Sequence, residues 1–101
     1  MRQRLLKVDH TPAEIIPGLF LGSVGAAENR GSLFRLEITN VLNCCPGVDN
    51  KYPSEFDYLT LNLKDTEDQE LDEALELGLK YLHKCLSKGK NVLVHCFRGV
   101  S

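Results

Sequence analysis

The stretch that most constrains the fold is NVLVHCFRGVS, residues 91–101. Its first five residues form a nearly continuous apolar run, which is typical of a strand buried on both faces in a parallel sheet. Cys96 follows this strand directly, with Gly99 and Ser101 in the short turn after it. Because ligands of open α/β sheets bind beyond the carboxyl ends of the strands, the sequence predicts a cysteine at a ligand site.

The rest of the chain alternates strand-like apolar runs with helix-like segments. The expected elements, in chain order, are two short strands within 14–23, helical turns over 24–29 and 32–37, strands over 38–45 and 58–63, a long helix over 66–87 and a strand over 91–95. This order predicts an α/β fold with a mostly parallel central sheet flanked by helices. In the absence of repeats or a linker, we expect one domain over 14–101, preceded by a flexible N-terminal arm over 1–13.

Turn and capping residues indicate where these elements begin and end. Pro17-Gly18 separates the first two strands, because proline presets φ and glycine permits a positive φ. Gly31 is expected to end the first helical turn. Thr66 and Gln69 form a plausible capping box for the long helix. One face of that helix is apolar, with a small residue that permits close approach to the sheet; the face consists of Leu71, Leu75, Gly78, Leu79, Leu82 and Leu86.

Composition narrows the class of protein. The chain has 101 residues and a formal net charge of −2, which gives no reason to expect nucleic-acid binding. An acidic run over 65–76 is interpreted as a solvated helix start. No apolar run suits a signal peptide or a membrane span, so we expect a cytoplasmic, and alternatively nuclear, protein with no membrane partner. In that reducing environment the four cysteines do not indicate disulfides, and without a CxxC motif no metal site is expected.

The residues after the last strand suit binding of an anion. The turn over 97–101 can direct successive backbone N–H groups toward one centre, and such donors would stabilise a thiolate at Cys96. The plain alternative is that Cys96 is a small buried hydrophobic residue. The buried strand, the His-Cys pair, Gly99 and the hydroxyl of Ser101 together favour a nucleophile.

These residues resemble a known signature. The pattern His95-Cys96-x-x-Gly99-x-Ser101 is similar to the HCxxGxSR motif of cysteine-dependent protein phosphatases, in their dual-specificity branch. The resemblance extends over almost the whole chain, in the family's order, through the segments IIPGLFLGS (15–23), AAEN (26–29), LEITNVLNC (36–44), YPSEFDYLTLNLKD (52–65) and GKNVLVHC (89–96).

The resemblance implies a role for each matching residue. Cys96 would attack the phosphorus of a phosphorylated protein side chain, and His95 would support the loop and lower the pKa of the cysteine. Asp65 matches the general acid, with Asp68 as the rival candidate. The phosphoryl oxygens would be bound by the loop's backbone N–H groups, from Phe97, Arg98, Gly99, Val100 and Ser101. No cofactor is implied.

Arg98 is not at the position of the family's catalytic arginine, which would directly follow Ser101. We therefore interpret Arg98 as a charge at the rim of the loop. Since that arginine, the next hydroxyl residue and the C-terminal helices are not in this sequence, we expect a truncated domain with weak or no activity on its own.

The other cysteines are considered individually. Cys44 and Cys45 end an expected strand, where alternation sends their side chains to opposite faces, so at most one can face Cys96. Some relatives protect the nucleophile with a disulfide at about this place, which makes either a possible redox partner; plain strand packing is the alternative. Cys85, on the long helix, is interpreted as packing.

Two functions therefore remain as hypotheses, and a third was considered. The first is a dual-specificity phosphatase acting on phosphotyrosine and phosphoserine or phosphothreonine. The second is a non-catalytic phosphate-binding or protein-interaction module. A rhodanese-like sulfur carrier would also use a cysteine loop after a strand, but the segments upstream do not fit it.

Overall fold

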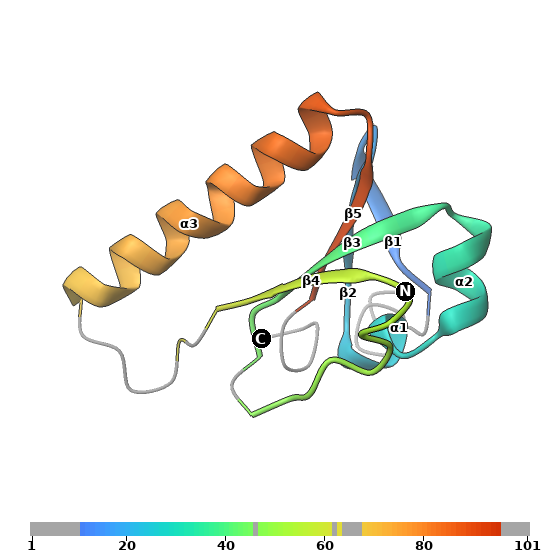
Figure 1. The fold of residues 1–101 in the computed structure, drawn as a ribbon, viewed down its shortest axis with the longest axis horizontal. Coiled ribbons are helices and arrows are strands. Elements are labelled where there is room, and N and C mark those ends of the chain that lie inside the picture. The colour runs from blue at the N-terminus through green and yellow to red at the C-terminus, as the bar shows by residue number, and fades with distance from the viewer. Residues whose placement is uncertain (1–10, 46, 62, 64–67, 96–101) are drawn as a thin grey trace, which may run out of the picture.

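A five-stranded sheet organises the part of the chain that the computed structural model describes, residues 11–45, 47–61, 63 and 68–95. Its order is β1-β2-β5-β3-β4 (Figure 1). The strands are β1 Ala13–Ile16, β2 Leu19–Gly22, β5 Asn91–His95, β3 Ile38–Asn43 and β4 Asp57–Thr60. β1 pairs with β2 antiparallel, and the other three pairings are parallel. The expected mostly parallel sheet is confirmed.

The first two strands form the expected hairpin. Gly18 adopts a φ of +88°, which only glycine tolerates well at a tight turn, and its N–H donates to the Glu14 carboxylate at 3.1 Å. β1 begins at Ala13, one residue before the expected start of the domain. Of the expected arm over 1–13, residues 1–10 lie outside the described part of the chain.

β5 lies in the middle of the sheet, as its apolar sequence predicts. It pairs with β2 on one side and β3 on the other, and Val92 and Leu93 are fully buried. Such two-sided burial explains why the strand does not alternate polar and apolar residues. Leu93 belongs to the main hydrophobic cluster, which otherwise consists of Phe20, Ala27, Leu33, Ile38, Val41 and Phe56.

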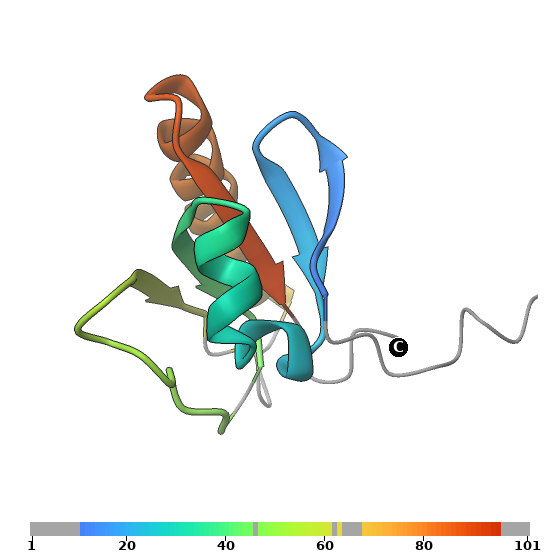
Figure 2. The same cartoon turned by 90° about the vertical axis from the view of Figure 1, so that its right-hand side faces the viewer.

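Helices cover both faces of this sheet. α1 (Val24–Ala27) and α2 (Arg30–Arg35) lie on one face, and α3 (Asp68–Ser87) lies on the other (Figures 1 and 2). The expectation that Gly31 ends the first helical turn is wrong, since Gly31 is the second residue of α2. The reason is a cap: the Asn29 side chain accepts a hydrogen bond from the Ser32 N–H at 3.2 Å and starts a new helix there.

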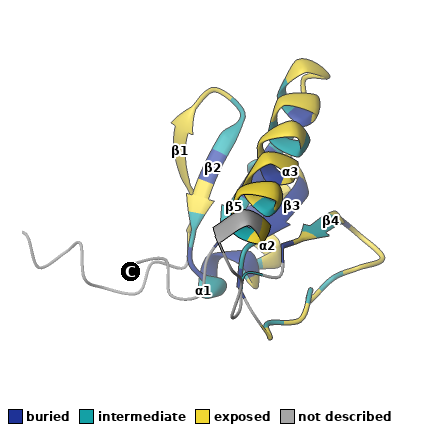
Figure 3. Ribbon diagram, turned by 90° about the vertical axis from the view of Figure 1, so that its left-hand side faces the viewer, coloured by how far each residue is buried: buried dark blue, intermediate teal, exposed yellow. Residues whose placement is uncertain are grey.

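The face of α3 that packs against the sheet differs from the leucine-rich face that the sequence predicts. Gly78 lies close to the sheet side of the helix: a Cβ there would lie 3.0 Å from Leu61 Cδ1 and 3.5 Å from Leu42 Cδ2. Leu75 and Leu79, expected on the buried face, are 46% and 66% exposed. Figure 3 shows that exposed positions cover much of α3. The buried stripe is centred on Gly78 and Cys85 and is rotated away from these two leucines. The other expected positions on the face are half-buried, namely Leu71, Leu82 and Leu86.

Candidate active site

The carboxyl ends of four strands meet in register at one edge of the sheet. His95, the last residue of β5, pairs with Gly22 of β2 on one side and with Asn43 of β3 on the other. Asn43 in turn pairs with Thr60, the last residue of β4. The chain that follows His95 therefore starts from the middle of this edge, where open α/β sheets bind their ligands.

The side chain of Asn43 organises the loop beyond β3. Asn43 is fully buried, and its Nδ2 donates to the Val48 carbonyl and to Asn50 Oδ1, both at 2.9 Å. Its Oδ1 accepts the Cys45 N–H, also at 2.9 Å. Asn50 Nδ2 then donates to Thr60 Oγ1 at 3.2 Å, which ties the loop to the end of β4. One asparagine thus fixes the backbone of the β3–β4 connection beside His95.

This network also ends β3 two residues earlier than the sequence predicts. The expected strand over 38–45 stops at Asn43. An Asn side chain that accepts the N–H two residues on forms an Asx-type turn, which competes with continuation of the strand. Because Cys44 and Cys45 lie beyond the strand, the strand-alternation argument for their orientation does not apply to them.

Cys45 is buried against His95. Its Sγ lies 3.4 Å from His95 Nδ1 and donates to the His95 carbonyl oxygen at 3.7 Å, with Cys45 fully buried and His95 3% exposed. The Cys44 N–H donates to the same carbonyl at 3.0 Å. Both cysteines therefore hold the last residue of β5 in place, one through its backbone and the other through its thiol.

Burial sets the charge of His95. Desolvation lowers the pKa of the imidazole, and the negative charge of Glu28 opposes this shift only in part. The ring is therefore neutral at physiological pH. A neutral imidazole offers one N–H donor and one ring nitrogen acceptor, so it can position neighbouring groups through hydrogen bonds.

A hollow opens beside this network. Its volume is about 350 Å³, and Cys45, Asn50 and Thr60 are among the residues that line it. A volume of this size is at the lower end of the range for small-ligand sites. It suits a compact ligand.

The structure describes only part of the predicted site. His95, Cys44 and Cys45 are brought together at the edge of the sheet. The proposed nucleophile Cys96, the general acid Asp65 and the loop residues Phe97, Arg98, Gly99, Val100 and Ser101 lie outside the described residues. Asp68, the rival acid, is the first residue of α3.

Sequence reasoning missed Asn43 and Asn50, which hold the loop beside His95. The available signal was an asparagine at the end of an apolar strand, a position that favours a side-chain-stabilised turn. Among the residues described, no group of three or more His, Cys, Asp or Glu side chains could hold a metal ion. None of the described helices is long and apolar enough to cross a bilayer.

The mixed sheet between two helical layers is the fold of the protein tyrosine phosphatase class, as solved structures show. The chain resembles a human tyrosine phosphatase-like serine/threonine/tyrosine-interacting protein with a TM-score of 0.79 and 25% identity, over 92% of this chain and 66% of that one. It resembles DUSP15 with a TM-score of 0.76 and 26% identity, over 92% and 59%.

The sequence comparisons narrow the class to a family. The family model "Dual specificity phosphatase, catalytic domain" matches residues 19–101. Dual specificity protein phosphatase 22-A of Danio rerio is 37% identical over 87% of this chain and 42% of its own length. Dual specificity protein phosphatase 1 of Arabidopsis thaliana is 33% identical over 97% and 50%. The chain belongs to the dual specificity phosphatase family, and it spans about half the length of these relatives.

Proposed function

We propose that the chain carries the nucleophile half of a protein phosphatase that acts on phosphotyrosine and phosphoserine or phosphothreonine. The Cys96 thiolate attacks phosphorus, a P–S bond forms and the P–O bond to the substrate side chain breaks. Asp65 gives its proton to the leaving oxygen. Water then attacks the cysteinyl phosphate, with Asp65 as base, and releases inorganic phosphate and the thiolate. These steps use protein groups only.

The observation that carries the proposal is the construction of the edge at His95. Four aligned strand ends and a buried Cys45–His95 contact support the residue that precedes Cys96. A nucleophile must be held within a fraction of an ångström to act efficiently, and such positioning depends on a rigid scaffold and supporting hydrogen bonds. The edge supplies both at His95, the residue directly before Cys96.

A second function has one observation in its favour. A solved structure that this chain resembles is described as tyrosine phosphatase-like and as an interacting protein. The same scaffold in this chain would then bind a phosphorylated segment without hydrolysing it.

The catalytic proposal also covers the organisation of the chain. Residues 14–101 would form the N-terminal part of the catalytic domain, and the protein would be cytoplasmic or nuclear.

The two functions are separated by an assay with a small aryl phosphate. It is run on the 101-residue chain and on a chimera that continues from Ser101 with the arginine, hydroxyl residue and helices of a related phosphatase. We expect turnover in the chimera, its loss in Cys96→Ser, and a strong decrease in Asp65→Asn. A folded chimera that binds a phosphopeptide but releases no phosphate would contradict the catalytic proposal and support the binding module.

A further inference from the structure

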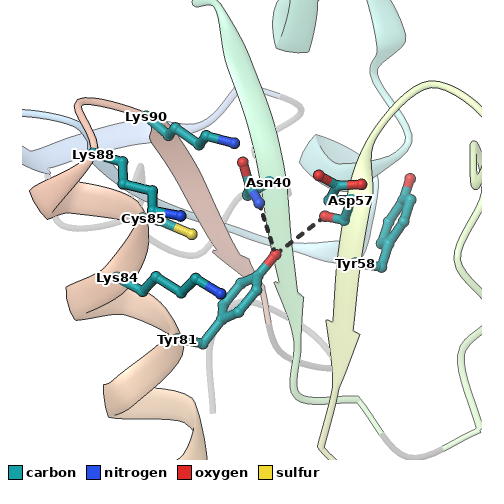
Figure 4. Close-up of a pocket in the computed structure, with 8 residues that line it drawn as sticks. All are labelled: Asn40, Asp57, Tyr58, Tyr81, Lys84, Cys85, Lys88 and Lys90. Atoms are coloured by element: carbon teal, nitrogen blue, oxygen red, sulfur yellow. Dashed lines mark hydrogen bonds between the residues drawn. The ribbon is translucent and has the colours of Figure 1, made fainter.

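A second cavity lies at the opposite end of the sheet from His95. It has a volume of about 360 Å³ and lies between the last turns of α3 and the amino ends of β3 and β4 (Figure 4). Because the strands are parallel, this end cannot belong to the edge where His95, Asn43 and Thr60 meet. Any ligand bound here is separate from the proposed phosphatase site.

The floor of this cavity is ordered by hydrogen bonds between the helix and the strands. Tyr81 Oη accepts from Asn40 Nδ2 at 3.1 Å and donates to the Asp57 carbonyl at 3.3 Å. Asn40 is 6% exposed and Cys85 is 3% exposed, so both are fixed by packing. The cavity is therefore a built feature of the contact between α3 and the sheet, and it does not depend on loose surface side chains for its shape.

The end of α3 brings three lysines to the rim. Lys84 and Lys88 are one helical turn apart. Gly89 has a φ of +75°, the Gly89 N–H donates to the Leu86 carbonyl at 3.0 Å, and the Lys90 N–H donates to the Cys85 carbonyl at 2.9 Å. This pair of bonds is a Schellman motif, which folds the chain back over the helix end. It places Lys90 beside the other two lysines, as Figure 4 shows.

The charges at the cavity do not cancel. Within the described part of the chain, no carboxylate lies within 4.0 Å of the three lysine ammonium groups. Asp57 adds one negative charge, and the C-terminus of α3 adds about half a charge more. The net charge at the cavity is therefore about +1.5, since the three ammonium groups outweigh both. The charges of Lys90 and Lys84 also reach the thiol of Cys85, where they oppose the rise in pKa that burial causes.

Stabilisation of the helix end explains only part of this arrangement. Cations near a helix C-terminus are favourable, which accounts for Lys84 in the last turn of α3 and for Lys88 directly after Ser87. It does not account for Lys90, which follows the helix, or for a cavity with an ordered floor below the three ammonium groups. We propose that this cavity binds a small anion with two or more negative charges, held by Lys84, Lys88 and Lys90 above the Asn40–Tyr81 floor.

The ligand is defined by its charge more than by its shape. Lysine ammonium groups act as mobile point charges and do not impose the planar, two-pronged geometry of arginine. Phosphate and carboxylate anions of similar charge therefore both suit the cavity. This proposal does not rest on the phosphatase function, because none of its residues lies at the His95 edge.

The test is a titration of the ¹⁵N-labelled 101-residue chain followed by NMR, with pyrophosphate in one arm and citrate in the other. We expect saturable shifts of the amides of Tyr81, Cys85 and Lys90 with at least one anion. The arm with the tighter binding identifies the phosphate or the carboxylate class. Lys84→Gln and Lys90→Gln should each weaken binding by about three- to fivefold, which corresponds to one exposed charge interaction. Lys80→Gln is the matched control on the same helix.

Three results would overturn the proposal. The first is the absence of saturable shifts around Tyr81 with either anion. The second is equal weakening by Lys80→Gln, which would indicate diffuse attraction to the helix. The third is a set of shifts confined to Asn43, Cys45 and His95, which would place the anion at the phosphatase edge and leave that proposal intact.

Discussion

Replacement of Asn43 by alanine tests whether one side chain holds the loop beside His95. The change removes three hydrogen bonds, two donated by Nδ2 and one accepted by Oδ1. It removes the bond that the N–H of the fully buried Cys45 makes to Asn43, whereas the half-buried Val48 and Asn50 can bond to water. An unsatisfied buried polar group costs about 1–3 kcal/mol, so we expect Asn43→Ala to lower the free energy of unfolding by about 2–4 kcal/mol.

The assay is urea unfolding followed by circular dichroism, with Asn50→Ala as the matched control. Asn50→Ala removes the bonds to Asn43 and Thr60, but no fully buried backbone group loses a hydrogen bond. We therefore expect it to lower the free energy of unfolding by only about 0.5–1.5 kcal/mol. An Asn43→Ala variant that is no less stable than Asn50→Ala would refute the assignment of loop order to Asn43.

Two further predictions concern pH and packing. Burial lowers the pKa of His95 in the folded state, so the unfolded state binds more protons below its own pKa of about 6.5. The contribution of His95 to stability should therefore be constant above that pH and fall as pH decreases through it. His95→Gln should remove this part of the pH dependence in urea unfolding, with the exposed His83→Gln as the matched control. Gly78→Leu should destabilise by about 1–3 kcal/mol, because a Cβ would already lie 3.0 Å from Leu61. Gly31→Ala, in a helix where a Cβ would make only an ordinary contact with Asn29 Oδ1 at 3.9 Å, should stabilise by about 0.5–1 kcal/mol.

Either of two results would contradict these expectations. A pH slope that persists in His95→Gln would assign the dependence to other groups. Equal effects at Gly78 and Gly31 would mean that the approach of α3 to the sheet is looser than the structure has it.

The sequence alone was sufficient to predict those elements whose form depends on local chemistry. The apolar run over 91–95 predicted a central strand because two-sided burial leaves no place for polar residues. Pro17-Gly18 predicted the hairpin because a tight turn needs these backbone conformations. The cysteine directly after the central strand lies outside the described residues, so the site at that edge stays a prediction.

The sequence alone was insufficient to predict those features that depend on tertiary contacts. Gly31 looked like a helix end, but the Asn29 cap starts a second helix around it. Leu75 and Leu79 match a helical apolar face, yet the close approach at Gly78 rotates the buried stripe away from them. The contact between Cys45 and His95 joins residues far apart in the chain, and spacing alone does not reveal it.

The central claim is that Cys96 is the nucleophile of a phosphatase whose supporting edge this chain builds. The most direct measurement is acid quenching of the chimera during turnover of an aryl phosphate, followed by mass spectrometric location of the phosphoryl group. The proposal predicts one phosphoryl group on Cys96 and none in Cys96→Ser. A phosphoryl group on another residue, or turnover that persists in Cys96→Ser, would contradict it.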